Sequence, residues 1–145
     1  DLLENEWDVA ADIWGVPSFN LLRRDGIETT RWNTLHPTET AKQPYVTETL
    51  SGAEGPFIAA TDYIRDYPER IRQYVPGEYY VLGTDGFGRS DTREQLRKFF
   101  EVNRYYVVVS ALKSLADAGS IKHEVVAQAI EKYGLDSEKT FPVHA

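Results

Sequence analysis

A glycine-rich loop contains the charged, hydroxyl and aromatic side chains that make the best candidate for a binding or catalytic site in this chain. It reads Gly83-Thr84-Asp85-Gly86-Phe87-Gly88-Arg89-Ser90-Asp91 and follows the apolar run 79–82. Glycines so closely spaced let the backbone turn tightly and let another group approach it, and we expect Gly88 to use a positive φ. A strand that ends here would present the loop at the carboxyl edge of a sheet, where open α/β sheets place their binding surfaces.

Three roles for this loop are open. A phosphate site is one, although the glycine order differs from the dinucleotide fingerprint and Asp85 would set a negative charge against a phosphate. A structural turn that packs Phe87 into a neighbouring chain or domain is favoured, because a loop-tip aromatic between glycines suits insertion into a pocket. Direct contact with a substrate is the third. Arg89 could pair with a carboxylate or phosphate, or form a surface or inter-subunit ion pair.

The histidines form no catalytic or metal-binding set. His36, His123 and His144 are scattered along the chain, and no H-x-x-x-H or H-E-x-x-H spacing occurs. We interpret His36, which precedes Pro37, as a hydrogen-bonded loop residue rather than a base.

Hydroxyl and carboxyl groups of the loop also lack a catalytic context. Ser90 is not in the G-x-S-x-G pattern of a hydrolase nucleophile. Asp91, three residues before Glu94, is explained as a helix cap, which leaves Asp85 without a visible partner. We therefore assign no catalytic, cofactor-binding or metal-binding residue. The candidate site is an interface or active-site-entrance loop: Gly83, Asp85, Gly86, Phe87, Gly88, Arg89 and Ser90.

Alternating strand and helix patterns position this loop. Strands are expected over 10–16, 57–60 and 79–82. Helices are expected over 1–7, 18–24, 29–35, 45–50, 62–71, 91–100, 105–119 and 125–134. In this interpretation Asp25-Gly26 breaks one helix from the next, and Asp62 caps another. The alternation predicts an α/β fold with three layers and a mainly parallel sheet.

Composition excludes several classes of protein. With 145 residues and 41% hydrophobic residues, we expect one domain, 1–145. A net charge of −7 argues against nucleic-acid and anionic-membrane partners. The absence of cysteine excludes disulfides and thiolate metal sites. No long apolar run or leader pattern occurs, so we expect no membrane partner and a cytoplasmic location.

Several separated motifs resemble a known family. The loop and the following 96–100 helix resemble the Gly-x-Asp-x-Phe-Gly-x-Ser motif and Phe-Phe helix of the C-terminal domain in transketolase-like thiamine diphosphate enzymes. More closely, the chain resembles the C-terminal domain of the homodimeric pyruvate dehydrogenase (acetyl-transferring) component. That likeness is carried by residues 12–19, 31–37, 61–63 and 105–109, and covers nearly the whole chain.

The resemblance implies a parent enzyme that uses thiamine diphosphate and magnesium to decarboxylate pyruvate. It also implies transfer of the acetyl group to a lipoyl group of a dihydrolipoyl acetyltransferase partner. In that family the cofactor and magnesium ligands lie mainly in two preceding domains, and their Gly-Asp-Gly…Asn-Asn signature is absent here. The domain is implied to serve homodimer assembly and to border the active-site entrance, and we expect the isolated chain to bind no cofactor and to be inactive.

The beginning of the chain reads as part of a longer polypeptide. The chain has no methionine, and residues 1–7 resemble the second half of an amphipathic helix without capping residues before it. In the family, a strand and the start of this helix precede that point. We therefore expect a fragment that associates with the rest of its own polypeptide and whose sheet lacks its first strand.

Two other functions stay open. The chain could be a free-standing α/β binding or regulatory module that uses the glycine loop for a small anionic ligand, which ligand titration would detect. It could also belong to a related transketolase-like enzyme that acts on another 2-oxo acid or a sugar phosphate.

Overall fold

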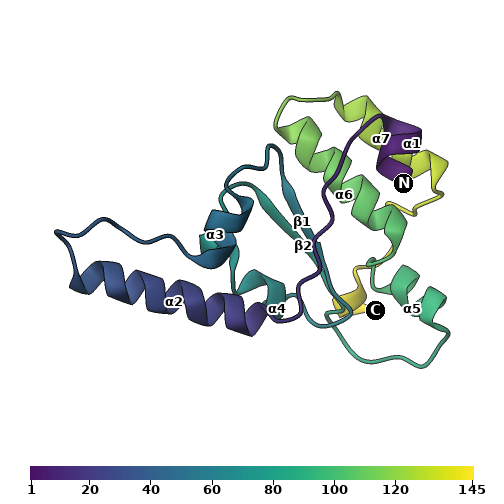
Figure 1. The fold of residues 1–145 in the computed structure, drawn as a ribbon. Coiled ribbons are helices and arrows are strands. Elements are labelled where there is room, and N and C mark those ends of the chain that lie inside the picture. The colour runs from purple at the N-terminus through teal and green to yellow at the C-terminus, as the bar shows by residue number, and fades with distance from the viewer.

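A parallel pair of strands lies at the centre of the fold. The computed structural model describes residues 1–145, and in it β1 (Phe57–Ala60) pairs with β2 (Tyr79–Leu82) in parallel. Parallel pairing requires a crossover connection, and here the crossover holds α4 (Asp66–Glu69) and the 3-10 helix η1 (Arg72–Tyr74). The carboxyl ends of both strands therefore meet at one edge of the sheet (Figure 1).

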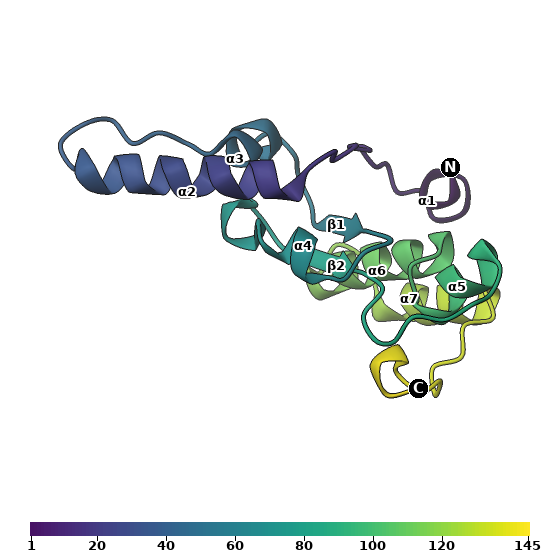
Figure 2. The same cartoon turned by 90° about the horizontal axis from the view of Figure 1, so that it is seen from below.

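Helices cover both faces of this sheet. On one face lie α2 (Phe19–Leu35) and α3 (Tyr45–Leu50), and on the other lies α6 (Arg104–Asp117), which contacts both strands (Figure 2). Successive side chains of a strand point to opposite faces, so Val81 belongs to the core under α3 and Leu82 to the core on the α5 and α6 side. The expected three-layer α/β class is confirmed.

The remaining helices are short. They are α1 (Leu2–Trp7), α5 (Arg93–Phe99), α7 (His123–Lys132) and the 3-10 helix η2 (Pro142–His144). No helix in the structure combines the length and apolar character that a membrane span requires.

A helical core joins α1 to α6 and α7. The Trp7 indole N–H donates to the Tyr133 hydroxyl at 2.7 Å, and that hydroxyl donates to Glu6 at 2.8 Å. Lys132 Nζ lies 2.8 Å from the same Glu6 carboxylate. Leu112 of α6 is fully buried in this core. The polar chain and the apolar core together hold α1 against the two helices.

Both central strands, and the helices α6 and α7, lie where their sequence patterns predict. The stretch 105–109 is rich in β-branched and aromatic residues, yet it is helical within α6, as the helical spacing of the apolar positions predicts. Gly119 after α6 and Gly134 after α7 have φ of 78° and 60°, the left-handed conformation that favours glycine at helix ends.

Residues 10–16 do not form the predicted strand. They make no backbone hydrogen bond, and Ile13 is 92% exposed. They run as an irregular connection from α1 to α2 (Figure 1). A strand is stabilised by the backbone hydrogen bonds of a neighbouring strand, and these residues have no such neighbour, so their apolar composition alone does not produce one. The sheet consequently has two strands, in keeping with an α/β fold that lacks a strand.

Asp25 and Gly26 do not break a helix, because α2 continues over 17 residues. Gly26 is buried, and a Cβ atom there would lie 2.3 Å from the Tyr74 ring. The Asp25 carboxylate accepts a hydrogen bond from the backbone N–H of Tyr45 at 2.6 Å. Both residues therefore serve contacts between α2 and its neighbours rather than a turn.

We expect Gly26→Ala to destabilise the fold, although alanine favours helices by about 1 kcal/mol. The new methyl group would overlap the buried Tyr74 ring, and overpacking of this kind typically costs about 1–3 kcal/mol. Chemical denaturation measures the free energy of unfolding. Gly52→Ala, where nothing lies within 4 Å of the new Cβ, is the control. A Gly26→Ala variant as stable as the Gly52→Ala variant would contradict the steric explanation.

Candidate functional site

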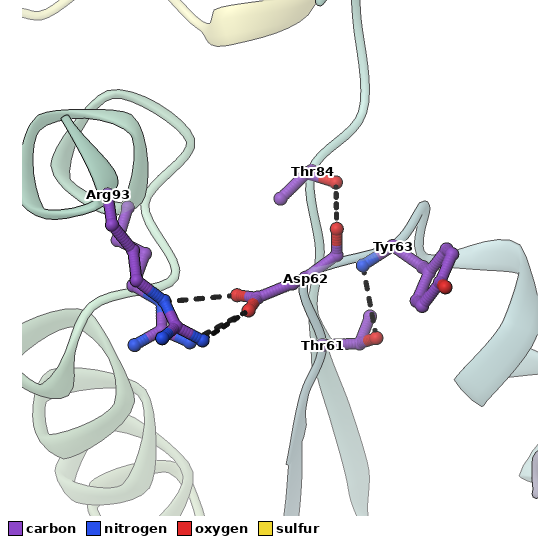
Figure 3. Close-up of polar contacts among 6 residues, drawn as sticks. Thr61, Asp62, Tyr63, Thr84 and Arg93 are labelled. Carbon is purple, nitrogen blue, oxygen red and sulfur yellow. Dashed lines mark hydrogen bonds and ion pairs between the residues drawn. The ribbon is translucent and has the colours of Figure 1, made fainter. Parts of the chain in front are cut away.

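The connections after β1 and β2 form one hydrogen-bonded unit at the carboxyl edge of the sheet. Thr61 N–H donates to the Leu82 carbonyl at 3.0 Å, and Thr84 N–H donates to the Tyr63 carbonyl at 2.8 Å. The Thr84 hydroxyl also donates to the Asp62 carbonyl at 3.0 Å (Figure 3). The pairing of the two strands thus extends beyond their ends and holds the start of the glycine loop.

Asp62 connects this edge to α5. Its carboxylate accepts two hydrogen bonds from Arg97, from Nη2 at 2.7 Å and from Nε at 3.2 Å. Arg93 Nη2 lies 3.7 Å from it, and Figure 3 shows the carboxylate directed toward that side chain. The prediction that Asp62 caps a helix is wrong, because α4 begins only at Asp66. The sequence offered one signal for this contact, two arginines spaced i, i+4 on α5.

Hydrogen bonding from Arg97 holds the pKa of the Asp62 carboxyl below its usual value. At neutral pH the group is therefore ionised and paired. An ionised carboxylate has no proton to donate, and one that accepts two hydrogen bonds from an arginine is a poor base. The arrangement suits Asp62 for orienting α5 rather than for proton transfer.

Asp85 has a partner that the sequence did not reveal. One carboxylate oxygen accepts a hydrogen bond from the backbone N–H of Arg65 at 2.9 Å, and the other lies 3.3 Å from Arg65 Nε. Gly83 allows this approach, because a Cβ there would lie 2.8 Å from the Arg65 nitrogen and 2.9 Å from the Tyr63 carbonyl oxygen. Asp85 is thus committed to holding the two connections together.

The other two glycines of the loop meet different constraints. Gly86 has a φ of 110°, and a Cβ atom there would lie 3.0 Å from the Pro142 carbonyl oxygen. Gly88 is not among the residues with positive φ, and nothing lies within 4 Å of its Cβ position. The expectation of a positive φ at Gly88 is therefore wrong. Gly86 is the loop glycine that needs this conformation.

Phe87 projects from the tip of the loop. Its side chain is 85% exposed, so it fills no pocket within this chain. Arg89 lies with its guanidinium carbon 4.1 Å from the centre of the Phe99 ring, a cation–π contact. The loop thus presents a free aromatic group beside an arginine that is already held.

The start of α5 differs by one residue from the prediction. Its N-cap is Thr92, whose hydroxyl accepts the Gln95 N–H at 3.3 Å. The Asp91 carboxylate instead accepts the Thr92 N–H at 2.7 Å, so Asp91 stabilises the turn before the cap. A shallow pocket of about 270 Å³ lies beside this turn, lined by Arg89, Ser90, Asp91, Gln95, Leu96 and Phe99.

The three histidines do not come together in one site. His36 stacks on Trp32 with ring centres 4.3 Å apart, and its Nδ1 lies 2.8 Å from the Trp32 carbonyl oxygen. His123 Nε2 lies 2.9 Å from Asp117. No group of three or more His, Cys, Asp or Glu side chains is arranged to hold a metal ion. The structure therefore brings together no set of three such protein ligands for magnesium.

The chain matches a known domain family over most of its length. Residues 1–103 match the family described as the transketolase-like TK C-terminal domain, and the chain belongs to that family.

Comparison with curated proteins identifies individual relatives with similar sequences. The chain is 59% identical to the pyruvate dehydrogenase E1 component of Pseudomonas aeruginosa and 56% identical to that of Cupriavidus necator. It is 48% identical to that of Escherichia coli. These matches cover 98%, 99% and 98% of this chain and 16% of each relative. The resemblance to this component is confirmed, and the chain spans about 16% of the length of these relatives.

We expect the Asp62 carboxyl to titrate below the usual aspartate range in carbon-detected NMR of the chain. Since its pKa is lowered on folding, the associated stability is complete above about pH 4 and is lost as the pH falls through the lowered value. Arg97→Gln should raise this pKa more than Arg93→Gln, because Arg97 donates both hydrogen bonds. Equal titration in all three proteins would contradict the assigned cause.

Proposed function

We propose that this chain is the C-terminal part of a pyruvate dehydrogenase E1 polypeptide and that the whole polypeptide is the active enzyme. The observation that carries the proposal is 59% identity to the Pseudomonas aeruginosa E1 component across 98% of this chain. The reaction is decarboxylation of pyruvate, followed by transfer of the acetyl group to a lipoyl group of a dihydrolipoyl acetyltransferase. Thiamine diphosphate, when bound with magnesium, supplies the carbanion stabilisation that this decarboxylation needs.

Within that enzyme, residues 1–145 form an assembly domain rather than the chemical centre. The carboxylates at the glycine loop support this role, because Asp62 and Asp85 are both engaged by arginines. Phe87 supports it too, since an aromatic side chain that is 85% exposed at a loop tip can bury itself in a pocket of another subunit or domain. We assign the cofactor and magnesium ligands to the remainder of the polypeptide.

We also propose partners and a location for this enzyme. The domain packs against the rest of its own polypeptide and against a second copy of the enzyme, and the homodimer delivers acetyl groups to the acetyltransferase within a multienzyme complex that follows glycolysis. The cytoplasm is the proposed location. The glycine loop borders the active-site entrance in this arrangement.

We expect the full-length polypeptide to release carbon dioxide from labelled pyruvate when thiamine diphosphate and magnesium are present. The 145-residue chain alone should release none and should show no heat of thiamine diphosphate binding in calorimetry. Adding a chelator to the full-length protein should abolish release. A full-length protein without decarboxylase activity would overturn the proposed reaction, and turnover by the purified chain would overturn the division of labour.

We expect Phe87→Ala in the full-length enzyme to weaken dimerisation, since losing a fully buried aromatic contact costs roughly 3–5 kcal/mol. Analytical ultracentrifugation measures the dimer fraction, and turnover should fall with it and recover at high protein concentration. The stability of the isolated chain should not change, because Phe87 is exposed there.

Tyr45→Ala is the matched control for this experiment. Tyr45 is a 63% exposed aromatic on α3, away from the glycine loop, and its removal should leave the dimer fraction unchanged. A Phe87→Ala enzyme that stays dimeric yet loses turnover would refute the anchor role. Asp85 and Arg89 would then be the next residues to replace.

A further inference from the structure

The C-terminal segment, residues 136–145, contacts both ends of the unit formed by the glycine loop and α5. In Figure 1 it ends beside the connection between β2 and α5. One contact is at Gly86, near the start of the loop, and the other is at the turn that follows α5. Both contacts join residues that are distant in sequence. Lys139 and the Phe99 carbonyl are 40 residues apart, and Gly86 contacts Pro142.

At the loop, the contact is steric. Pro142 is buried, and its carbonyl oxygen lies 3.0 Å from the position that a Cβ atom of Gly86 would take. The neighbouring Phe141 ring lies 5.5 Å from the guanidinium carbon of Arg65, the arginine that pairs with Asp85. The segment therefore packs against the loop and against the side chain that anchors it.

At the end of α5, the contact is polar. Lys139 Nζ donates to the Phe99 carbonyl at 2.5 Å and to the Glu101 carboxylate at 3.0 Å. Both charged side chains are about one quarter exposed, at 24% and 23%. A cation at the carboxyl end of a helix is favourable, because the last carbonyl groups there lack partners within the helix.

Glu101 itself has an uncommon backbone conformation. Its φ is 61°, the left-handed region that residues other than glycine adopt at a cost. Such strain persists only where surrounding contacts maintain it. The Lys139 ammonium, which bonds both the Glu101 carboxylate and the Phe99 carbonyl, is positioned to do so.

We propose that residues 136–145 act as a strap that holds the glycine loop and α5 in one arrangement. Lys139 and Pro142 are then positioning residues for Phe87 and Arg89. All the contacts of the strap lie within this chain. Its consequence for dimerisation and turnover rests on the proposed function.

The test uses hydrogen exchange of the full-length polypeptide, followed by mass spectrometry. Lys139→Met removes the ammonium and keeps most of the side chain's bulk. It should speed exchange about tenfold for the hydrogen-bonded N–H groups of Thr84, Thr92 and residues 100–102, the loss expected for a hydrogen bond to a charged group. Lys139→Arg should restore protection. Lys122→Met, at an exposed lysine with no ion pair, should change neither region.

A second variant tests the other end of the strap. Gly86→Ala strains a φ of 110° and crowds the Pro142 carbonyl, so it should speed exchange in the peptides covering 83–92 and 141–145 together. If the strap positions Phe87, turnover and the dimer fraction of the Lys139→Met enzyme should fall, and Lys139→Arg should recover both.

The outcomes separate the two claims. Unchanged exchange in Lys139→Met, or faster exchange over the whole protein, would overturn the strap. Local loosening with normal dimerisation and turnover would overturn the positioning role. A wild-type polypeptide that does not decarboxylate pyruvate would overturn the proposed function, while the exchange results would still decide the strap.

Discussion

Parallel pairing of β1 with β2 determines how the helices and the glycine loop are arranged. It places the carboxyl ends of both strands at one edge, and the pairing continues through Thr61 and Thr84 into the following connections. The alternation of side chains sends Val81 and Leu82 into different cores. The same short ladder therefore both binds helices to its two faces and fixes where the glycine loop emerges.

Charge at this edge orients the backbone rather than performing chemistry. Asp62 joins the end of β1 to α5 through Arg97, and Asp85 joins the glycine loop to Arg65. Half-exposed ion pairs contribute little stability individually. They restrict geometry instead, because each carboxylate makes two contacts. Asp62 accepts two hydrogen bonds from the Arg97 guanidinium, and Asp85 contacts both the backbone N–H and the side chain of Arg65. Phe87 is left free at the tip, as a group that contacts another surface would be.

Several elements followed from local patterns alone. The apolar spacing over 105–119 indicated a helix despite β-branched residues, and α6 is found there. The strands 57–60 and 79–82 were delimited by glycine and proline, and both are found. Residues 10–16 show the limit of such patterns. They have the composition of a strand, but a strand requires a hydrogen-bonded neighbour, and composition does not report whether one is present.

The α/β class, the central strands, the position of the glycine loop and the family resemblance could all be predicted from the sequence, because these depend on residue types close together along the chain. The contacts of individual glycines and aspartates, in contrast, are visible only in the folded chain. Gly26 faces Tyr74, Asp85 meets Arg65, and Gly86 faces a carbonyl at the far end of the chain. Such contacts join residues distant in sequence, and their chemistry appears only once the strands and helices have brought them together.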